Sequence, residues 1–159
     1  MEIILREGQK TDMSAVLSLI QELASFEKEA NAVELSVEEL ERDGFGPQPL
    51  FRVFVAERNN EIVGMALFYE RYSTWKGRSI HLEDLIVKHQ YRGEGIGKAL
   101  YTKVLTYAHD QNLKRVSWEV LDWNTVAIDF YNSTGANILE SWKVVHMNEN
   151  SLDAFVSKD

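Results

Sequence analysis

Three glycines stand within five positions of the stretch QYRGEGIG, residues 90–97, at Gly93, Gly95 and Gly97. The stretch follows the apolar run Leu-Ile-Val and precedes a segment whose apolar residues recur at helical spacing. A glycine-rich connection between a strand and a helix exposes backbone N–H groups at the positive end of the helix dipole, where phosphate groups bind. These residues therefore indicate a site for a phosphate-bearing ligand.

Two common phosphate motifs do not fit this stretch. A P-loop requires a glycine five residues before the Gly-Lys pair and a Ser or Thr after it, whereas the pair Gly97-Lys98 has Arg92 and Ala99 there. A dinucleotide-binding fingerprint requires a third glycine three residues after the second, where this chain has Lys98 or a leucine. The pattern that remains is Arg-x-x-Gly-x-Gly, formed by Arg92, Gly95 and Gly97.

Composition excludes several other kinds of site. With no cysteine in 159 residues, disulfides, thiolate metal sites and a cysteine nucleophile are excluded. Four histidines show no metal-ligand spacing: His81, His89, His109 and His146. The formal net charge of −8 disfavours nucleic acid as the main partner, because phosphate neutralisation needs clustered Lys and Arg, and it suits a cationic ligand. We therefore expect no metal and no nucleic-acid partner.

Length and hydropathy indicate one domain over residues 1–159. The chain is 45% hydrophobic and 26% charged, which is ordinary for a soluble globular domain. No apolar stretch approaches the roughly 20 residues of a bilayer span, and the start MEIILREGQK lacks the features of a signal peptide. We expect a cytoplasmic protein that does not bind membranes.

The first half of the chain predicts a strand, two helices and a hairpin. Residues 2–8 alternate weakly and predict a strand, and Thr11 is expected to cap a helix with an apolar stripe. Ser36 and Glu39 form a capping box for a second, short helix. Residues 51–57 and 62–72 are rich in β-branched and aromatic residues and are joined across Asn59-Asn60, which predicts an antiparallel hairpin.

The second half predicts strands that alternate with helices. Residues 78–87 and 114–121 favour strands, and helical spacing runs from about Gly95 to Gln111. Asn124 opens a helix that stops at Gly135, and residues 136–148 predict one or two closing strands. The order β-α-α-β-β-β-α-β-α-β indicates an α/β (α+β) domain with helices covering an antiparallel-rich sheet.

With this element order around Arg92-x-x-Gly-x-Gly, the sequence resembles the GNAT superfamily of acyl-CoA-dependent N-acyltransferases. The resemblance extends from about residue 3 to residue 147 and is greatest to the diamine (spermidine/spermine) acetyltransferases and their thialysine-acetylating relatives. Four stretches carry it: DGFG at 43–46, LED at 82–84, YRGEGIG at 91–97 and WNTVAIDFYNSTGA at 123–136. It implies the GNAT fold, a mixed, mostly antiparallel central sheet flanked by about four helices, and a homodimer.

The resemblance also implies that the cofactor is acetyl-CoA. The loop backbone is expected to bind the CoA pyrophosphate, and the strand to pair with the pantetheine arm, which Asn124 also contacts. Arg92 and Lys98 are close enough in sequence to add positive charge, or are solvated surface groups. The cofactor-binding residues expected on the loop and strand are Leu85, Ile86, Val87, Arg92, Gly93, Glu94, Gly95, Ile96, Gly97 and Lys98.

N-acetylation requires an amine that has lost its proton. An amine with a pKa of about 10 is mostly protonated at neutral pH, so a carboxylate must take the proton, directly or through water. The resemblance assigns this role to Glu83, for which a salt bridge or a turn hydrogen bond is the alternative. In a regular strand Glu83 and Asp84 point to opposite faces, so we expect only one of them to face the cleft. Asp84 is expected to have a structural role.

The departing thiolate of CoA requires a proton donor. A phenol with a pKa near 10 can protonate it without being ionised at rest. Asn124 and Tyr131 are seven residues apart and share one face of their helix. The resemblance implies that Tyr131 is the general acid. The spacing alone is also consistent with Tyr131 as an aromatic residue of the core. Because the chain has no cysteine for an acyl-enzyme, we expect direct attack in a ternary complex, with a backbone N–H near residues 85–87 meeting the oxyanion.

Substrate-side residues are less defined. Phe26 and Glu27 match the aromatic-Glu pair of the family, Trp75 matches its loop tryptophan, and Glu83 and Asp84 complete the expected set. Six glutamates between residues 27 and 41 form an acidic region that could attract a polyamine or a lysine-like amine, or is a solvated face. Diamine acetyltransferases carry an Asp where this chain has Ser73, so a shorter amine such as thialysine is at least as plausible as a polyamine.

Two other functions remain open from the sequence. An enzyme for protein or peptide amines would need an open groove, which a sequence cannot display. A non-catalytic acyl-CoA-binding or regulatory module would keep the glycine loop and need neither Glu83 nor Tyr131.

Overall fold

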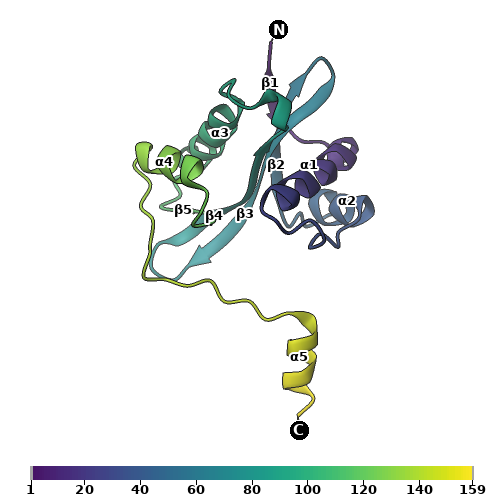
Figure 1. Ribbon diagram of the computed structural model, residues 1–159, viewed down its shortest axis with the longest axis vertical. Coiled ribbons are helices and arrows are strands. Elements are labelled where there is room, and N and C mark those ends of the chain that lie inside the picture. The colour runs from purple at the N-terminus through teal and green to yellow at the C-terminus, as the bar shows by residue number, and fades with distance from the viewer. Residues whose placement is uncertain (1, 159) are drawn as a thin grey trace. The chain divides into compact units, whose positions relative to one another are not determined.

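A five-stranded sheet organises the computed structural model, which describes residues 2–158 (Figure 1). The strands lie in the order β1-β2-β3-β4-β5. All neighbours are antiparallel except β4 and β5, which are parallel, so the expected mixed and mostly antiparallel sheet is confirmed. The strands are β1 Ile4–Glu7, β2 Arg52–Arg58, β3 Glu61–Ser73, β4 Gly77–Val87 and β5 Val116–Ser117.

Contacts divide the chain into two compact units, residues 1–119 and 120–159. The first unit contains the sheet, α1 Met13–Phe26, α2 Val37–Phe45, α3 Ile96–Asp110 and two short 3-10 turns, Lys10–Asp12 and His89–Tyr91. The second unit contains α4 Thr125–Ser133 and α5 Glu149–Val156. The described residues thus form five α-helices instead of about four, and α5 is one that the sequence did not predict.

Local signals account for most element boundaries. Asn59 and Asn60 have φ of 53° and 63°, the left-handed conformation that a tight hairpin turn requires. Ser36 and Glu39 form the predicted capping box at the start of α2. The expected cap at Thr11 is wrong, because Thr11 lies inside the 3-10 turn Lys10–Asp12 and Asp12 is the N-cap residue of α1.

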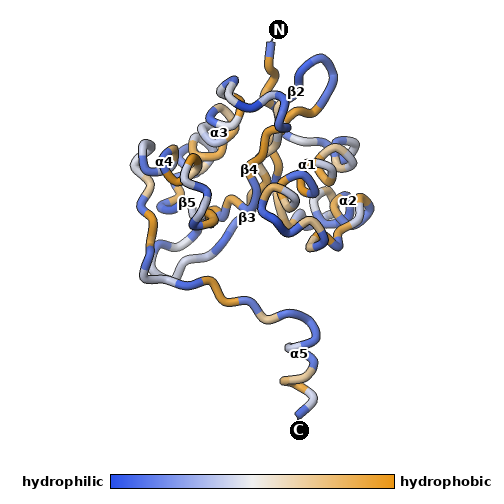
Figure 2. Tube along the Cα trace, in the orientation of Figure 1, coloured by the Kyte–Doolittle hydropathy of each residue, from blue (hydrophilic) through white to orange (hydrophobic). Residues whose placement is uncertain are grey.

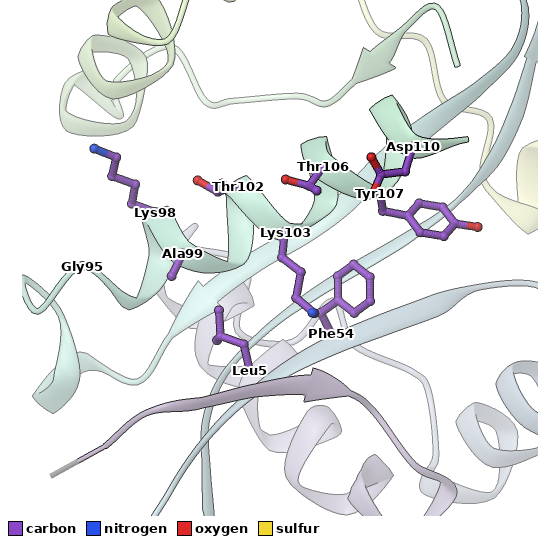
Figure 3. A pocket seen from close by; sticks show the side chains of 10 residues that line it. All are labelled: Leu5, Phe54, Gly95, Lys98, Ala99, Thr102, Lys103, Thr106, Tyr107 and Asp110. Carbon is purple, nitrogen blue, oxygen red and sulfur yellow. The ribbon is translucent and has the colours of Figure 1, made fainter. Parts of the chain in front are cut away.

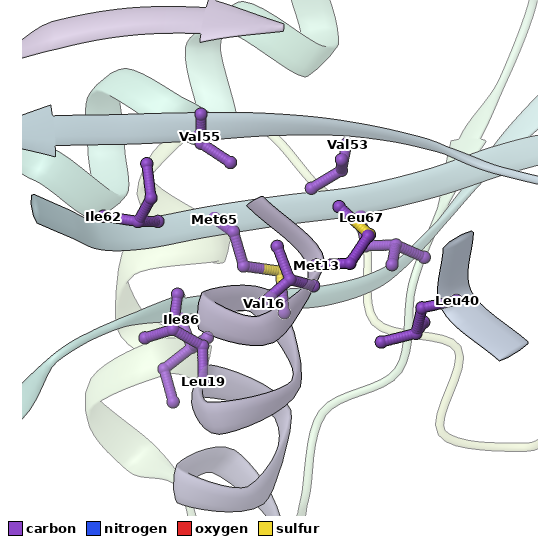
Figure 4. Packing of buried hydrophobic residues seen from close by; sticks show 10 residues of the cluster. All are labelled: Met13, Val16, Leu19, Leu40, Val53, Val55, Ile62, Met65, Leu67 and Ile86. Carbon is purple, nitrogen blue, oxygen red and sulfur yellow. The ribbon is translucent and has the colours of Figure 1, made fainter. Parts of the chain in front are cut away.

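The hydrophobic core lies on both faces of the sheet. On one face α1 and α2 pack against β2, β3 and β4 (Figure 4); this cluster contains Met13, Val16, Leu19, Leu40, Val53, Val55, Ile62, Met65, Leu67 and Ile86. On the other face α3 contributes Tyr107, whose ring lies 5.4 Å from that of Phe68 and 6.2 Å from that of Phe54. Full burial of a valine, leucine, isoleucine, phenylalanine or methionine side chain stabilises a fold by about 1.5–3 kcal/mol.

The closing strands expected over residues 136–148 are wrong, since this segment has no regular structure. A strand needs a neighbouring strand to which it is hydrogen-bonded, and none of the described strands pairs with this segment. Apolar residues recur along it, as Figure 2 shows between α4 and α5, and its Trp142 and Val145 are 67% and 87% exposed. None of the helices within residues 2–158 has both the length and the hydropathy to span a membrane.

Candidate active site

A β-bulge in β4 brings two carboxylates to one face of the sheet. Leu67 pairs with Asp84 and Phe68 with Leu82, so Glu83 is an extra residue that is opposite no residue in the backbone register of β3. A bulge breaks the two-residue alternation of a strand. Asp84, opposite Leu67, therefore faces α1. The expectation that Glu83 and Asp84 point to opposite faces is wrong, because it assumed a regular strand.

Glu83 lies on the same face as Asp84. The Tyr69 hydroxyl donates a 2.9 Å hydrogen bond to Oε2 of Glu83, and His81 Nε2 lies 3.6 Å from that oxygen. Tyr69 is two residues from Leu67 in β3 and pairs with His81. The side chain of Glu83 remains 51% exposed, so one carboxylate of the pair is accessible to a substrate.

Electrostatic repulsion and burial perturb the acidic groups of this face. Burial first, then the charges of Glu83 and Glu27, raise the pKa of Asp84 to about 6. Burial also raises the pKa of Glu27, which follows the last residue of α1. The structure thus brings together three of the expected site residues, and their combined negative charge favours an approaching cation.

Two residues that the sequence analysis did not select complete this cluster. Burial and the hydrogen bond to Glu83 raise the pKa of Tyr69 to about 12, so its hydroxyl remains a donor at neutral pH. The imidazole of His81 is buried and reaches Ser117 on β5, with Nδ1 2.9 Å from Oγ. A sequence signal existed for His81 alone, two residues before Glu83, where strand alternation places both on one face.

The glycine loop presents backbone N–H groups at the start of α3 that no side chain within residues 2–158 caps. Gly93 and Gly95 have φ of 82° and 83°, and nothing lies within 4 Å of where a Cβ would stand at either position. Gly95 is the N-cap of α3, and no side chain caps this terminus, whereas Ser36 caps α2 and Asn124 caps α4. The first amides of a helix have no intrahelical acceptors, so this open terminus fits the pyrophosphate of CoA.

The side chain of Arg92 is engaged within the protein. Its Nε donates a 2.9 Å hydrogen bond to the carbonyl oxygen of Val87, and Nη2 lies 3.6 Å from Glu22 on α1. The guanidinium also lies 5.2 Å from the ring centroid of Phe26. Glu22 in turn accepts a 2.9 Å hydrogen bond from the backbone N–H of His89. These contacts tie the start of the loop to the C-terminal half of α1, next to the substrate-side pair Phe26-Glu27.

Two other charged residues expected to bind the cofactor, Glu94 in the loop and Lys98 in the first turn of α3, have contacts other than the carboxylates. Glu94 forms a 2.7 Å ion pair with Arg58 at the end of β2. Lys98 lines a hollow of about 680 Å³ along α3, with Lys103 and Phe54 among the other lining residues (Figure 3). None of the lining residues belongs to the carboxylate cluster, so this hollow is separate from it.

The second half of β4 has an open edge. Its pairing with β5 is limited to Ile80 with Val116 and His81 with Ser117. From residue 82 to 87, β4 has no strand partner on that side among the described residues. The side chain of Ile86 is in the core beneath α1, so only its backbone could contact a ligand. An open strand edge of this length fits the amide groups of a pantetheine arm.

Trp75 lies far from this cluster along β4, and Tyr131 belongs to the second unit. Trp75 lies in the turn between β3 and β4, before Gly77, the first residue of β4. Glu83 is six residues after Gly77, about 20 Å along the strand at about 3.3 Å per residue. Tyr131 belongs to α4 in the second unit, seven residues after Asn124, whose Oδ1 accepts a 3.3 Å hydrogen bond from Ala127. The helix opened by Asn124 and the left-handed Gly135 after it, with φ of 89°, are as predicted.

Sequence comparison identifies relatives over most of the chain. The model of the Acetyltransferase (GNAT) family matches residues 17–136. The thialysine N-epsilon-acetyltransferase of Bos taurus is 42% identical over 151 residues, which cover 88% of this chain and 89% of that protein. The spermidine/spermine N(1)-acetyltransferase-like protein 1 of Homo sapiens is 34% identical, with 93% of this chain aligned to 23% of that longer protein.

Solved structures share the fold. An integron cassette protein from the mobile metagenome of V. cholerae superposes with a TM-score of 0.81 at 22% identity, over 99% of both chains. An aminoglycoside acetyltransferase from an uncultured soil metagenomic sample superposes with a TM-score of 0.73 at 25% identity, over 92% of this chain and 94% of that one.

Proposed function

Since this chain belongs to the GNAT acetyltransferase family, we propose that it transfers the acetyl group of acetyl-CoA to the side-chain amine of thialysine or a similar lysine-like molecule. That it is an acetyl-CoA-dependent N-acetyltransferase of small amines follows from relatives about 40% identical over nearly the whole chain. The proposal of a lysine-like substrate is supported by the thialysine N-epsilon-acetyltransferase of Bos taurus, which is 42% identical to this chain, whereas the spermidine/spermine-type relative is 34% identical.

The turn at Ser73 supports a short amine. Its Oγ accepts hydrogen bonds from the backbone N–H groups of Trp75 (3.2 Å) and Lys76 (3.1 Å), so the residue closes the β3–β4 turn. Arg115 also donates to this hydroxyl, at 3.2 Å. A neutral side chain beside an arginine gives this position no attraction for the far end of a long polycation.

The residues proposed to hold acetyl-CoA are those of the open helix terminus and the open strand edge. Backbone N–H groups of residues 93–98 would bind the pyrophosphate, and the backbone of residues 85–87 would pair with the pantetheine arm. Bound acetyl-CoA supplies a thioester whose carbonyl carbon is open to attack by an amine. An N–H group on the same strand edge would stabilise the negative charge on the carbonyl oxygen.

Proton transfers are assigned to Glu83 and Tyr131. Glu83 is accessible and would take a proton from the ammonium group, directly or through water. Asp84 and Glu27 would keep the cationic amine nearby, with Phe26 beside its aliphatic part. Tyr131 would give its proton to the thiolate as the C–S bond breaks.

We further propose a homodimer in which both units of each chain belong to one acetyltransferase domain. The matched region 17–136 crosses the boundary between the units at residue 119, which supports one domain. Exposed apolar side chains in the second unit, such as Trp142 and Val145, support a protein–protein contact.

Thiol release from acetyl-CoA tests the function, with thialysine, lysine, ornithine, putrescine, spermidine and a lysine-bearing peptide offered separately. We expect the highest kcat/KM with thialysine and at least tenfold less with spermidine. A preference for spermidine would reject the lysine-like substrate. Release with the peptide alone would favour a protein acetyltransferase, and acetyl-CoA binding without turnover would favour a non-catalytic module. Glu83→Gln, with the same shape and no base, is the matched control.

A further inference from the structure

The buried imidazole of His81 lies between Glu83 and β5, and the proposed reaction gives it no role. His81 is 7% exposed and is the last residue of β4 paired with β5, opposite Ser117. Its Nε2 faces Oε2 of Glu83 at 3.6 Å. Its Nδ1 faces Ser117 Oγ at 2.9 Å and Nη1 of Arg71 at 3.5 Å.

The partners of Nδ1 select one tautomer of the ring. A guanidinium can only donate, and a serine hydroxyl can donate or accept. With Nη1 of Arg71 3.5 Å from Nδ1, a proton on Nδ1 would meet a positive charge. Nδ1 is therefore the acceptor for the hydroxyl of Ser117, with the Arg71 charge beside it. The single proton of the neutral ring is then on Nε2, on the side of the Glu83 carboxylate.

Both groups that face Glu83 approach the same oxygen. Tyr69 donates to Oε2 at 2.9 Å, and Nε2 of His81 lies 3.6 Å from the same oxygen. Among the residues that the structure describes, none donates to Oε1. A separation of 3.6 Å is longer than a hydrogen bond, but catalytic contacts often shorten when substrate binds.

We propose that His81 is a positioning residue, in its Nε2–H tautomer, that with Tyr69 holds Oε2 of Glu83 and leaves Oε1 for the proton of the amine. The proposal rests on Glu83 as the base of the proposed function. His81 does not carry the proton itself, because its Nε2 is already a donor.

Polar and charged side chains approach this ring, or the carboxylate beside it, from β3 and β5. Arg71 and Tyr69 on β3 and Ser117 on β5 are in contact with it or its partner, and Glu119 acts on Tyr69 through its charge. On the α1 side the charges of Asp84 and Glu27 interact with each other. The pH profile of activity therefore reflects the titration of several groups. The variants must remove the contact made by Nε2 of His81 separately from the contact made by Nδ1.

Two polar substitutions make that separation. In His81→Gln the side-chain amide reaches the position of Nε2 and can donate to Glu83, whereas in His81→Asn the amide reaches only the position of Nδ1. We expect kcat of His81→Gln to stay within threefold of the wild type and that of His81→Asn to fall at least tenfold. KM for acetyl-CoA should be unchanged in both. The acidic limb of the kcat/KM profile should move to higher pH in His81→Asn alone, because a donor to the carboxylate is lost.

Nitrogen-15 NMR of the imidazole tests the tautomer without any turnover, with His81→Gln used to assign the signal. A neutral ring protonated on Nε2 supports the proposal, and one protonated on Nδ1 overturns it. Equal loss of kcat in His81→Gln and His81→Asn, at equal thermal stability, overturns it as well. If the wild-type protein acetylates no amine, the proposed function fails, and the NMR result still decides the arrangement of His81.

Discussion

Asp84 is a carboxyl group held between two other acids, Glu83 and Glu27, beneath the end of α1. Its pKa is raised from 3.8 to about 6 in the folded protein. Between about pH 4 and 6 the folded state therefore binds more protons than the unfolded state. The free energy of unfolding must fall as the pH rises through this window, since the ionised form is the one that the fold disfavours.

Asp84→Asn should remove this cost. We expect the free energy of unfolding at pH 7 to rise by about 2 kcal/mol and its decrease between pH 4 and 6 to flatten, as measured by urea unfolding at several pH values. Asp110→Asn, whose carboxyl group is exposed at the end of α3, is the control and should change stability by less than about 0.5 kcal/mol. A slope that stays the same in Asp84→Asn would contradict the assignment of the shift to this residue.

Tyr131 should affect turnover and not binding. Tyr131→Phe removes only the hydroxyl, so we expect kcat to fall roughly 100-fold while the Kd for acetyl-CoA stays within about twofold. Steady-state kinetics and isothermal titration separate the two quantities. Tyr72→Phe, at an exposed position of β3, serves as control and should keep the wild-type kcat. Wild-type turnover in Tyr131→Phe would show that Tyr131 is not the proton donor for the thiolate.

At the scale of elements, the loop before α3 combines a required conformation with an open surface. An L side chain at Gly95 would be strained at φ of 83°, whereas a Cβ at Gly97 would meet Val87 at an ordinary 3.7 Å. We expect Gly95→Ala to lower the free energy of unfolding by about 1–2 kcal/mol and to weaken acetyl-CoA binding. Gly97→Ala should be neutral or stabilise by about 0.5 kcal/mol. Equal effects of the two substitutions on urea unfolding would contradict a role for the backbone conformation.

Signals that act over a few residues were sufficient to predict several elements. The Asn59-Asn60 turn, the Ser36-Glu39 box and the α3 boundary each depend on neighbours in the sequence, and each is confirmed. The bulge at Glu83 depends instead on the register with β3, which alternation along one strand cannot reveal.

Side-chain partners distant in sequence were also beyond prediction. Arg92 was expected either to add positive charge to the pyrophosphate site or to be a solvated surface group, and neither expectation included the contacts of its guanidinium with Val87, Glu22 and Phe26. Likewise, Tyr69 joins the site through a hydrogen bond that spans 14 residues. Residue types and local spacing predicted the chemistry of the candidate site, and tertiary contacts determine its arrangement.

At the scale of the whole molecule, the exposed apolar side chains of residues 136–148 bear on assembly. If this segment contributes to the proposed homodimer, Trp142→Ser combined with Val145→Ser should convert a dimer to a monomer in sedimentation velocity. Val126→Ser removes a valine of α4 that is 81% exposed, close to the 87% of Val145, and should leave the dimer intact. A wild-type protein that sediments as a monomer at micromolar concentration would reject the dimer.

Glu83 is the residue of β4 that pairing with β3 does not use. Leu82 opposite Phe68 and Asp84 opposite Leu67 would already alternate as a regular strand without it. A chain shortened by this single residue is therefore expected to keep its register and its buried side chains and to lose its base. The insertion of one codon into such a strand can thus add a base for proton transfer without changing the rest of the sheet, so a single mutation can separate a structural sheet from a catalytic one.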